Sequence, residues 1–358
     1  MPNFNLTIFP LTFSFLITVV ATPLSIFTLK KFNIVDDPKK HKHPAIIHKK
    51  PTPRGGGIPL FIGVLVASIF FLPLTKIIIA TLIAAFFSLL IGVIDDKYDL
   101  SPYLRFVINI LCAVLVVFMG ANIPFITNPF GGILNFSHLQ IPLLGGTAIS
   151  FLSYGIAVLW IVWVMNMLNW SKGVDGQMPG IVAISAIVIG ILSLRFSHLD
   201  QTSATAATLS FIVAGASLGF LIFNYYPAKI FPGYGATAIY LILAVASILS
   251  GAKLATAILV MGVPMTDGFI TIARRILSGK SPFWHDKKHL HHLLLSLGFG
   301  QRRIALFYWT ISAILGALSL VLSSKGKLFA IIMLVILAGG AILFLQFLLK
   351  RADDETSL

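Results

Sequence analysis

Long apolar runs fill most of this 358-residue chain, and they constrain its fold more than any other feature. A bilayer core needs about 20 apolar residues in each crossing helix, and about eleven such runs can be delimited. Hydrophobic residues make up 57% of the chain and charged residues only 11%, whereas soluble domains carry roughly 25% charged residues. The candidate spans are 5–29, 56–74, 77–94, 103–120, 148–168, 178–195, 204–224, 237–252, 254–273, 303–323 and 328–349. The sequence therefore predicts an all-α polytopic integral membrane protein.

Lysine and arginine are distributed unevenly over the connections between these spans. With the N-terminus outside, the connections on the cytoplasmic side hold all 26 Lys and Arg residues except Lys76, Arg195, Lys253, Lys325 and Lys327. Such an excess marks the cytoplasmic side of membrane proteins. We therefore predict one transmembrane domain over residues 1–350 in the cytoplasmic (inner) membrane, with a polar cytoplasmic tail at 351–358. The topology accounts for the net charge of +14, which does not indicate nucleic-acid binding.

The acidic residues also gather on one side. Of the twelve Asp and Glu residues, only Asp200 falls on the predicted outer side. Acids beside a helical membrane core are costly unless they serve a site, so their position predicts a polar site at the cytoplasmic face. The stretch 121–146 holds no Lys, Arg, Asp or Glu, and its turn residues predict a small outer hairpin.

The stretch 285–303 combines four of the nine histidines with one acid and four cations, in the sequence HDKKHLHHLLLSLGFGQRR. Three interpretations of His289, His291 and His292 stay open. A metal site is one, although the spacing lacks the usual zinc pattern and no cysteine contributes. An exposed basic loop without function is the second. In the third, these side chains donate hydrogen bonds to the oxygens of a phosphorylated substrate.

A second polar motif, DDKYDLSP at 95–102, follows the third apolar run. Paired carboxylates at a helix end bind a hard cation such as Mg²⁺, which prefers oxygen ligands. A cation held by Asp95 and Asp96 would bridge a diphosphate and neutralise charge as a phosphoryl bond breaks. The alternative is a solvated loop in which Asp99 caps a helix.

The first cytoplasmic connection contains the sequence HKKPTPRGGG at 48–57. Its cations could lie on anionic lipid, where each contributes about 1 kcal/mol. Alternatively, Lys49, Lys50 and Arg54 receive a lipid phosphate, and the glycines at 55–57 let the backbone approach it closely.

A third motif, NMLNWSKGVDG at 166–176, ends the fifth span. Together these motifs resemble those of the polyprenyl-phosphate N-acetylhexosamine-1-phosphate transferases, in the family's order from about residue 35 to residue 303. The family patterns are G-V-I-D-D-x-x-D-L-S, H-x-x-P-T-P-x-x-G-G and N-x-x-N-x-x-D-G-x-D-G. The last loop, S-P-F…D…H-L-H-H, resembles the UDP-GlcNAc branch more than the peptidoglycan branch.

The resemblance implies transfer of N-acetylhexosamine-1-phosphate, with GlcNAc the expected sugar, from a UDP-sugar to undecaprenyl phosphate or another polyprenyl phosphate. The reaction would release UMP at the cytoplasmic face and initiate cell-envelope glycan synthesis, such as lipopolysaccharide or teichoic acid. It implies a Mg²⁺ or Mn²⁺ cofactor held by the catalytic residues Asp95, Asp96 and Asp175. The implied substrate-binding residues are Lys49, Lys50, Arg54, Asn166, Asn169, Asp267, Arg274, Arg275, His289, His291 and His292. Both a monomer and a homodimer are compatible with the sequence.

Two positions depart from the family pattern. Lys172 stands where the family has an aspartate, and Tyr234 stands where the family's G-D-x-G-S motif has a metal-binding acid. Within about 4 Å of a dication, each such charge counts for several kcal/mol. Three outcomes stay open. The remaining acids catalyse the reaction alone, or Lys172 takes over part of the electrostatic role of the metal ion. In the third, the chain is a degenerate member that binds lipid phosphate or nucleotide without turnover. A transporter is a weaker hypothesis, because transporters place polar groups at mid-membrane.

Overall fold

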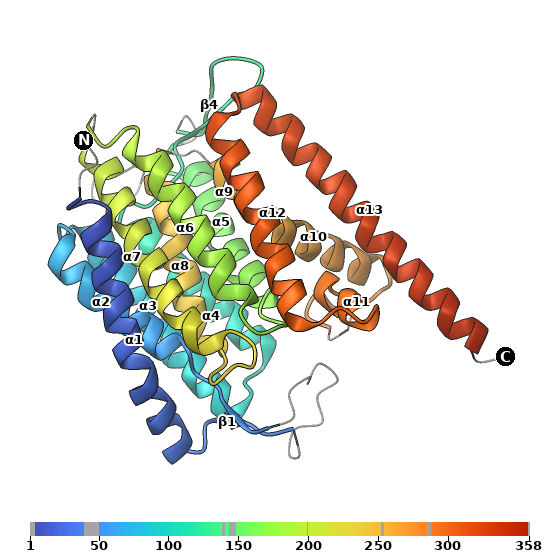
Figure 1. Ribbon diagram of the computed structural model, residues 1–358. Coiled ribbons are helices and arrows are strands. Elements are labelled where there is room, and N and C mark those ends of the chain that lie inside the picture. Colours follow the sequence, from blue (N-terminus) through green and yellow to red (C-terminus); the bar gives the residue numbers. More distant parts are fainter. Residues whose placement is uncertain are drawn as a thin grey trace.

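The computed structural model describes residues 4–38, 50–137, 140–142, 148–198, 200–251, 254–284, 286 and 288–356, and it is a helical bundle with three short antiparallel strand pairs (Figure 1). The helices are α1 Ile8–Lys31, α2 Gly57–Phe71, α3 Lys76–Tyr98, α4 Pro102–Phe118, α5 Phe151–Trp170, α6 Gln177–Leu194, α7 Gln201–Asn224, η1 Tyr234–Ala236, α8 Thr237–Leu249, α9 Leu254–Val260, α10 Gly262–Leu277, α11 Leu290–Ser296, α12 Gln301–Val321 and α13 Ser324–Thr356. The strands are β1 Val35–Asp36, β2 Thr52–Pro53, β3 Phe125–Thr127, β4 Ile133–Asn135, β5 Gln140–Pro142 and β6 Ala148–Ser150.

Seven helices of the described chain are long and apolar enough to cross a membrane: α1, α3, α5, α6, α7, α12 and α13. The bent pair α9 and α10 makes eight if it is one span. Helices α2, α4 and η1–α8 are apolar but shorter, and they coincide with the spans predicted at 56–74, 103–120 and 237–252. The structure thus agrees with a mostly helical polytopic membrane protein, while the count of eleven spans and the orientation of the termini stay predictions. Helix α13 continues to Thr356, so it includes most of the predicted tail.

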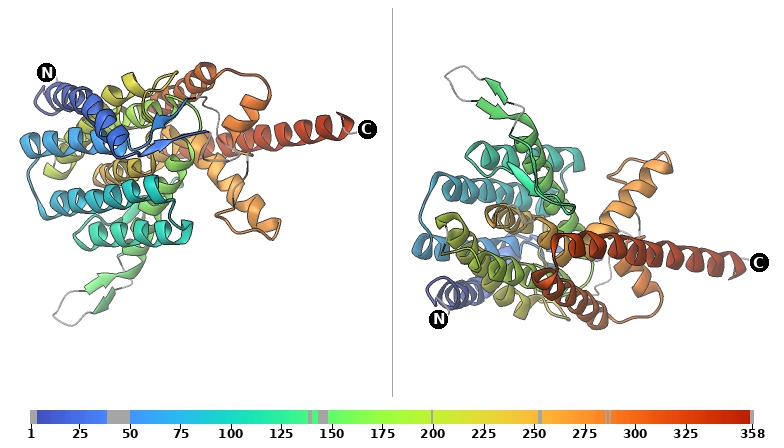
Figure 2. Two further views of the ribbon diagram at one scale, coloured as in Figure 1. Left: turned by 90° about the horizontal axis from the view of Figure 1, so that it is seen from below. Right: turned by 90° about the horizontal axis from the view of Figure 1, so that it is seen from above.

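The predicted span 254–273 is wrong as a single helix. The chain bends by 83° between α9 and α10. Pro264 lies in the first turn of α10, and it has no N–H to donate to the carbonyl of Val260, so one helical hydrogen bond is lost at this point, which favours the break. The bend turns α10 away from the bundle, beside α13 and near α11 (Figures 1 and 2).

Helix α8 forms the centre of the bundle. All thirteen of its residues are buried, and it packs against α3, α5 and α7. The outer helices instead expose large apolar side chains, for example Phe27 on α1 and Leu337 on α13, with exposed fractions of 71% and 68%. An apolar interior surrounded by an apolar exterior is the pattern of a bundle that faces lipid.

The strand pairs lie in the connections. β3 pairs with β4, which confirms the hairpin predicted within 121–146 but not the side on which it lies. β1 pairs with β2 and leads the chain to Arg54. From there, the backbone N–H groups of Gly55 and Gly56 donate to the carbonyl of Phe231, which joins the first connection to the segment before η1.

Glycines let α2 and α3 approach η1 very closely. A Cβ atom on Gly92 would lie 2.3 Å from the Cα atom of Gly235, and one on Gly57 would lie 2.2 Å from the carbonyl carbon of Gly235. Neither helix could come so near if it carried a side chain at this point, because the neighbouring atoms are backbone and cannot rotate away.

We expect Gly92→Ala to destabilise the protein by about 1–3 kcal/mol, because the added methyl group overpacks α3 against η1. The apparent melting temperature in detergent, followed by size-exclusion chromatography, measures the effect. Gly155→Ala is the matched control, because a Cβ atom there would meet nothing within 4 Å. Equal melting temperatures for the two variants would contradict the close contact.

Candidate functional site

A cavity of about 290 Å³ opens at the end of the bundle where α3 meets α4 and α5 meets α6. The described lining residues are Arg54, Pro102, Arg105, Asn166, Asn169, Trp170, Lys172, Gly173, Tyr234, Arg275, Phe283, Trp284, Asp286, His289, His291 and His292. Four of them are cationic and three are histidines, whereas Asp286 alone is acidic among these described residues. The wall of the cavity is therefore suited to an anion.

Asp95 lies behind this wall in an ion pair with Arg105. Both carboxylate oxygens of Asp95 accept hydrogen bonds from Nη1 of Arg105, at 3.1 and 3.0 Å, and Oδ1 also accepts from the N–H of Leu100 at 2.9 Å. The Asp95 side chain is 0% exposed and that of Arg105 is 17% exposed. The turn between α3 and α4 depends on Asp99, whose φ is 50°. The cation, not the carboxylate, thus faces the cavity.

Asp96 forms a second buried ion pair, with Arg54. Oδ1 of Asp96 lies 2.9 Å from Nε of Arg54 and accepts a hydrogen bond from the N–H of Tyr234 at 2.8 Å. Oδ2 accepts no hydrogen bond from the described residues and lies against Gly233, where a Cβ atom would come within 2.0 Å of it. Burial disfavours the charged form of Arg54, but the carboxylates around it, Asp96 first and then Asp36, Asp95 and Asp99, together outweigh burial and raise the pKa of Arg54 above its ordinary value.

The two departures from the family pattern, Lys172 and Tyr234, are neighbours in space. Nζ of Lys172 donates to the carbonyl of Gly233 at 2.8 Å and lies 5.7 Å from the centre of the Tyr234 ring. Cζ of Arg105 lies 5.0 Å from the same ring, and Nδ2 of Asn109 donates to the Tyr234 hydroxyl at 3.1 Å. Two cations therefore contact one aromatic ring, an arrangement that is stabilising when it is partly desolvated.

The charge state of Lys172 responds to its surroundings. Burial lowers its pKa to about 7, and the positive charge of Arg54 adds to this effect. The carboxylates of Asp96 and Asp95 oppose it, whereas Arg105 lowers the pKa further. An anion in the cavity would favour the ammonium form, because it brings negative charge close to Nζ.

Asp267 on α10 orients His289 from behind the cavity. Nδ1 of His289 shares a hydrogen bond with Oδ2 of Asp267 at 2.8 Å, and Oδ1 accepts from the N–H of Leu290 at 3.1 Å. The ring of His289 stacks on that of His291 with centroids 5.7 Å apart and an interplanar angle of 5°. Asp267 thus fixes a histidine of the cavity wall and does not line the cavity itself.

His291 is buried against the backbone of the loop between α5 and α6. A Cβ atom on Gly173 would overlap its Nε2 atom, so only glycine allows this approach. Burial lowers the pKa of His291 well below its ordinary value, and His292 and His289 add to the effect. His291 is therefore neutral at pH 7 and can donate a hydrogen bond without carrying charge.

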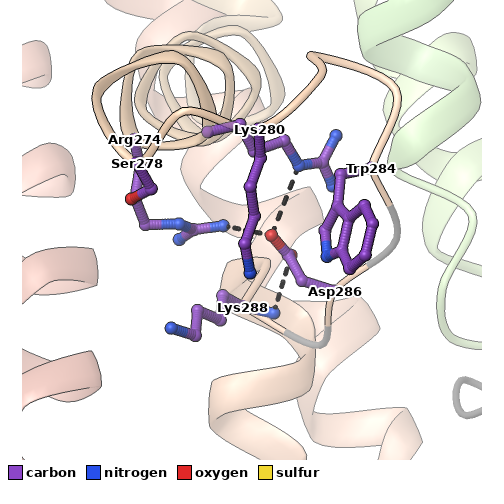
Figure 3. Close-up of a pocket in the computed structure, with 7 residues that line it drawn as sticks. Arg274, Ser278, Lys280, Trp284, Asp286 and Lys288 are labelled. Atoms are coloured by element: carbon purple, nitrogen blue, oxygen red, sulfur yellow. Dashed lines mark hydrogen bonds and ion pairs between the residues drawn. The ribbon is translucent and has the colours of Figure 1, made fainter.

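Arg274 and Arg275 meet at Asp286, beside a smaller pocket of about 70 Å³ (Figure 3). Oδ2 of Asp286 lies 2.8 Å from Nη2 of Arg274 and 3.3 Å from Nε of Arg275. Burial raises the pKa of Asp286, but the two arginines outweigh burial and leave it below its ordinary value. Lys280 and Lys288 also border this pocket, so it extends the cationic surface of the cavity.

The asparagines of the third motif line the cavity, but its aspartate does not. Nδ2 of Asn166 donates to the carbonyl of Val162, and the buried Oδ1 of Asn169 accepts no hydrogen bond from the described residues. Asp175 lies farther back, where Oδ2 accepts from the N–H of Ala228 at 2.9 Å.

The structure thus brings together part of the predicted set. The predicted residues that line the cavity are Arg54, Asn166, Asn169, Arg275, His289, His291 and His292. Those that do not line it are Lys50, Asp95, Asp96, Asp175, Asp267 and Arg274, and Lys49 lies outside the described residues. Arg105 and Trp170 also line the cavity and were not among the predicted site residues. The position of Arg105, in the first turn after the aspartate motif, was the available signal.

A magnesium ion needs several oxygen ligands at about 2.0–2.1 Å in near-octahedral geometry. Arg105 occupies both oxygens of Asp95, and Arg54 with the Tyr234 N–H occupies Oδ1 of Asp96, which leaves Oδ2 of Asp96 as an unpaired oxygen. The described residues include no group of three His, Cys, Asp or Glu side chains placed to hold a metal ion. The predicted ligands Asp95, Asp96 and Asp175 therefore do not fit a divalent cation.

Comparison with known proteins decides the family. Residues 78–251 match the sequence model of glycosyl transferase family 4. A protein of Bacillus subtilis named a probable undecaprenyl-phosphate N-acetylglucosaminyl 1-phosphate transferase is 31% identical over 334 residues, which cover 90% of this chain and 87% of the relative. The chain belongs to glycosyl transferase family 4. The resemblance found in its motifs is thereby confirmed.

Other relatives extend this family 4 assignment over most of the chain. The decaprenyl-phosphate N-acetylglucosaminephosphotransferase of Mycobacterium tuberculosis is 33% identical over 341 residues, covering 86% of this chain and 81% of the relative. The phospho-N-acetylmuramoyl-pentapeptide-transferase of Staphylococcus carnosus is 26% identical, covering 86% of this chain and 96% of the relative. The matched family segment includes Asp95, Arg105, Lys172 and Tyr234, whereas Arg54 precedes it.

We expect Arg105→Gln to destabilise the protein by about 3–5 kcal/mol, because it leaves the buried carboxylate of Asp95 without its counter-charge. The double variant Asp95→Asn/Arg105→Gln should regain most of this loss, because it leaves no unpaired charge. Apparent melting temperatures of Asp95→Asn, Arg105→Gln and the double variant in detergent measure the coupling between the two residues.

The control for this cycle is Arg303→Gln, an exposed arginine that does not line the cavity. If the double variant were as unstable as the sum of both single variants, the two residues would not act as a pair.

Proposed function

We propose that this protein transfers N-acetylglucosamine-1-phosphate from UDP-N-acetylglucosamine to a polyprenyl phosphate such as undecaprenyl phosphate. The relatives support the class of reaction, because their names describe transfer of a phosphorylated sugar to undecaprenyl or decaprenyl phosphate. The observation that carries the proposal is the cationic cavity at the end of an apolar helical bundle. A lipid phosphate and a nucleotide diphosphate are both anions, and this is where an anion with a lipid tail can be bound. We place this face at the cytoplasmic side, where the step would initiate cell-envelope glycan synthesis.

In the proposed reaction, an oxygen of the lipid phosphate attacks the β-phosphorus of the UDP-sugar. A new bond forms from that oxygen to the β-phosphorus, the bond from the β-phosphorus to the bridging oxygen breaks, and UMP leaves with the electron pair. A lipid phosphate is already ionised near pH 7, so no strong general base is required. Catalysis then consists of positioning and of stabilising negative charge on the phosphoryl oxygens.

The lining residues have distinct roles in this reaction. Arg54, Arg105, Lys172 and Arg275 bind phosphate oxygens, because all four face the cavity. His289 is positioned by Asp267, and neutral His291 donates a hydrogen bond to the sugar diphosphate.

The nucleotide is bound on the α5 side of the cavity. Asn166 and Asn169 offer amide groups there, and Trp170 offers an aromatic face to the uracil ring.

The test uses purified full-length protein in detergent with undecaprenyl phosphate and radiolabelled UDP-GlcNAc. We expect label in the lipid fraction and free UMP in equal amounts. Arg275→Gln should reduce kcat/KM by about 10²-fold, because it removes one stabilising donor from the phosphoryl group. Arg303→Gln should leave the rate unchanged, since Arg303 is exposed and does not line the cavity.

The second candidate, a non-catalytic member that binds polyprenyl phosphate, is favoured by one observation. The carboxylates of the aspartate motif are both neutralised by arginines. Binding of undecaprenyl phosphate without product from any UDP-sugar would establish that role and overturn the transferase.

The pKa of Lys172 predicts a pH dependence. The charged and titratable groups around it are Arg54, Arg105, Asp95, Asp96 and Tyr234, and together with burial they lower its pKa to about 7. In the free enzyme, Lys172 loses its proton as the pH rises through this value, so kcat/KM should fall above pH 7.

Lys172→Arg provides the comparison, because a guanidinium stays charged at every pH tested. The ratio of kcat/KM between wild type and this variant, measured from pH 6 to 9, isolates the effect from substrate ionisation. A constant ratio over this range would contradict the loss of a proton from Lys172 near pH 7.

A further inference from the structure

Asp95 and Asp96 lie behind the wall of the cavity, and the guanidinium groups of their partners lie between these carboxylates and the cavity. Asp95 and Asp96 have side chains that are 0% exposed, and neither lines the cavity. Their partners Arg105 and Arg54 do line it, with exposed fractions of 17% and 31%. A divalent cation entering the cavity would meet the guanidinium groups of Arg105 and Arg54 before it reached the carboxylate of Asp95 or Asp96.

Lys172 places a third cation beside these two. Its Nζ atom is held by the carbonyl of Gly233, on the backbone that also contacts Oδ2 of Asp96. Tyr234 fills the neighbouring space with an aromatic ring that both Lys172 and Arg105 contact. The Tyr234 hydroxyl accepts a hydrogen bond from Asn109, and the backbone N–H of Tyr234 donates one to Asp96. These two bonds hold the residue in place within the cluster.

We propose that this protein transfers the sugar phosphate without a divalent cation, and that Lys172 with Arg54 and Arg105 supplies the positive charge that the diphosphate requires. This inference rests on the proposed transferase function.

The charge balance of the cluster supports the proposal. Three cations, Arg54, Arg105 and Lys172, face two carboxylates, so the cluster is positive as the chain builds it. With aspartates at 172 and 234 the same cluster would be negative and would need a dication to bind a diphosphate. An ammonium group with three donors can contact oxygens of both phosphates, and arginine can bind one phosphate through two parallel hydrogen bonds. The residues present can therefore neutralise the charge that develops when UMP leaves.

The first experiment measures both metal binding and turnover of the full-length protein in detergent. Elemental analysis of purified protein and electron paramagnetic resonance titration with Mn²⁺ report binding independently of activity. The transfer assay is then run with excess EDTA and with Mg²⁺. We expect no stoichiometric metal, no tight Mn²⁺ site, and less than a twofold difference in rate between EDTA and Mg²⁺.

Other outcomes separate the two proposals. Transfer that stops in EDTA and returns with Mg²⁺, or one tightly bound Mn²⁺ per chain, would overturn the metal-free inference and leave the transferase intact. No labelled lipid under any condition would overturn the transferase, and the Mn²⁺ titration would still decide whether the cluster holds a metal.

A gain of metal dependence provides the second test. Lys172→Asp/Tyr234→Asp should create a Mn²⁺ site and make any transfer sensitive to EDTA, because two acids then join Asp96.

Lys172→Met, which keeps the length of the side chain but removes its charge, should lower kcat about 10²-fold with EDTA or with Mg²⁺ alike. Lys172→Arg should recover part of this loss. Melting temperatures of all variants identify any that fail to fold, and a double variant that folds but binds no Mn²⁺ would count against the inference.

Discussion

The buried ion pair between Asp96 and Arg54 is the interaction on which the site depends. It joins three segments that are distant in the sequence: the first connection, the end of α3 and the segment that leads into η1. A buried carboxylate is stable only when it is paired and hydrogen-bonded, so Asp96 fixes the position of both its partners. The Asp95–Arg105 pair repeats the arrangement between α3 and α4. In both pairs the acid lies inside and the cation forms the wall of the cavity.

The other side of the cavity depends on the bend between α9 and α10. Because the chain bends by 83° after α9, α10 leaves the bundle and carries Asp267, Arg274 and Arg275 toward the end where α3 and α5 terminate. Asp267 then orients His289, and Gly173 admits His291 against the loop after α5. The histidines of a late connection thus meet residues from the first third of the chain around one anion-binding space.

Much of the candidate site could be predicted, although in a different arrangement. The motifs indicated Arg54, Asn169 and His289, which line the cavity, because polar residues at one end of apolar runs are expected to share a site. The aspartates were predicted as ligands of one metal, but each has its own partner. Sequence spacing cannot show this, because Arg105 and Arg54 reach Asp95 and Asp96 only through the packing of α4 and the first connection on α3.

The sequence by itself determined that the chain is a helical membrane protein, because apolar runs of this length can be satisfied in lipid only as helices. It also determined the family, since local motifs keep their order whatever their contacts. Only the tertiary structure decided that Lys172 and Tyr234, two separate departures from the family pattern, are in contact and complete one positive cluster. The physical reason is that the net charge of a site is the sum of the charges within a few ångströms. Only folding brings side chains from α3, α4, η1 and two connections within that distance.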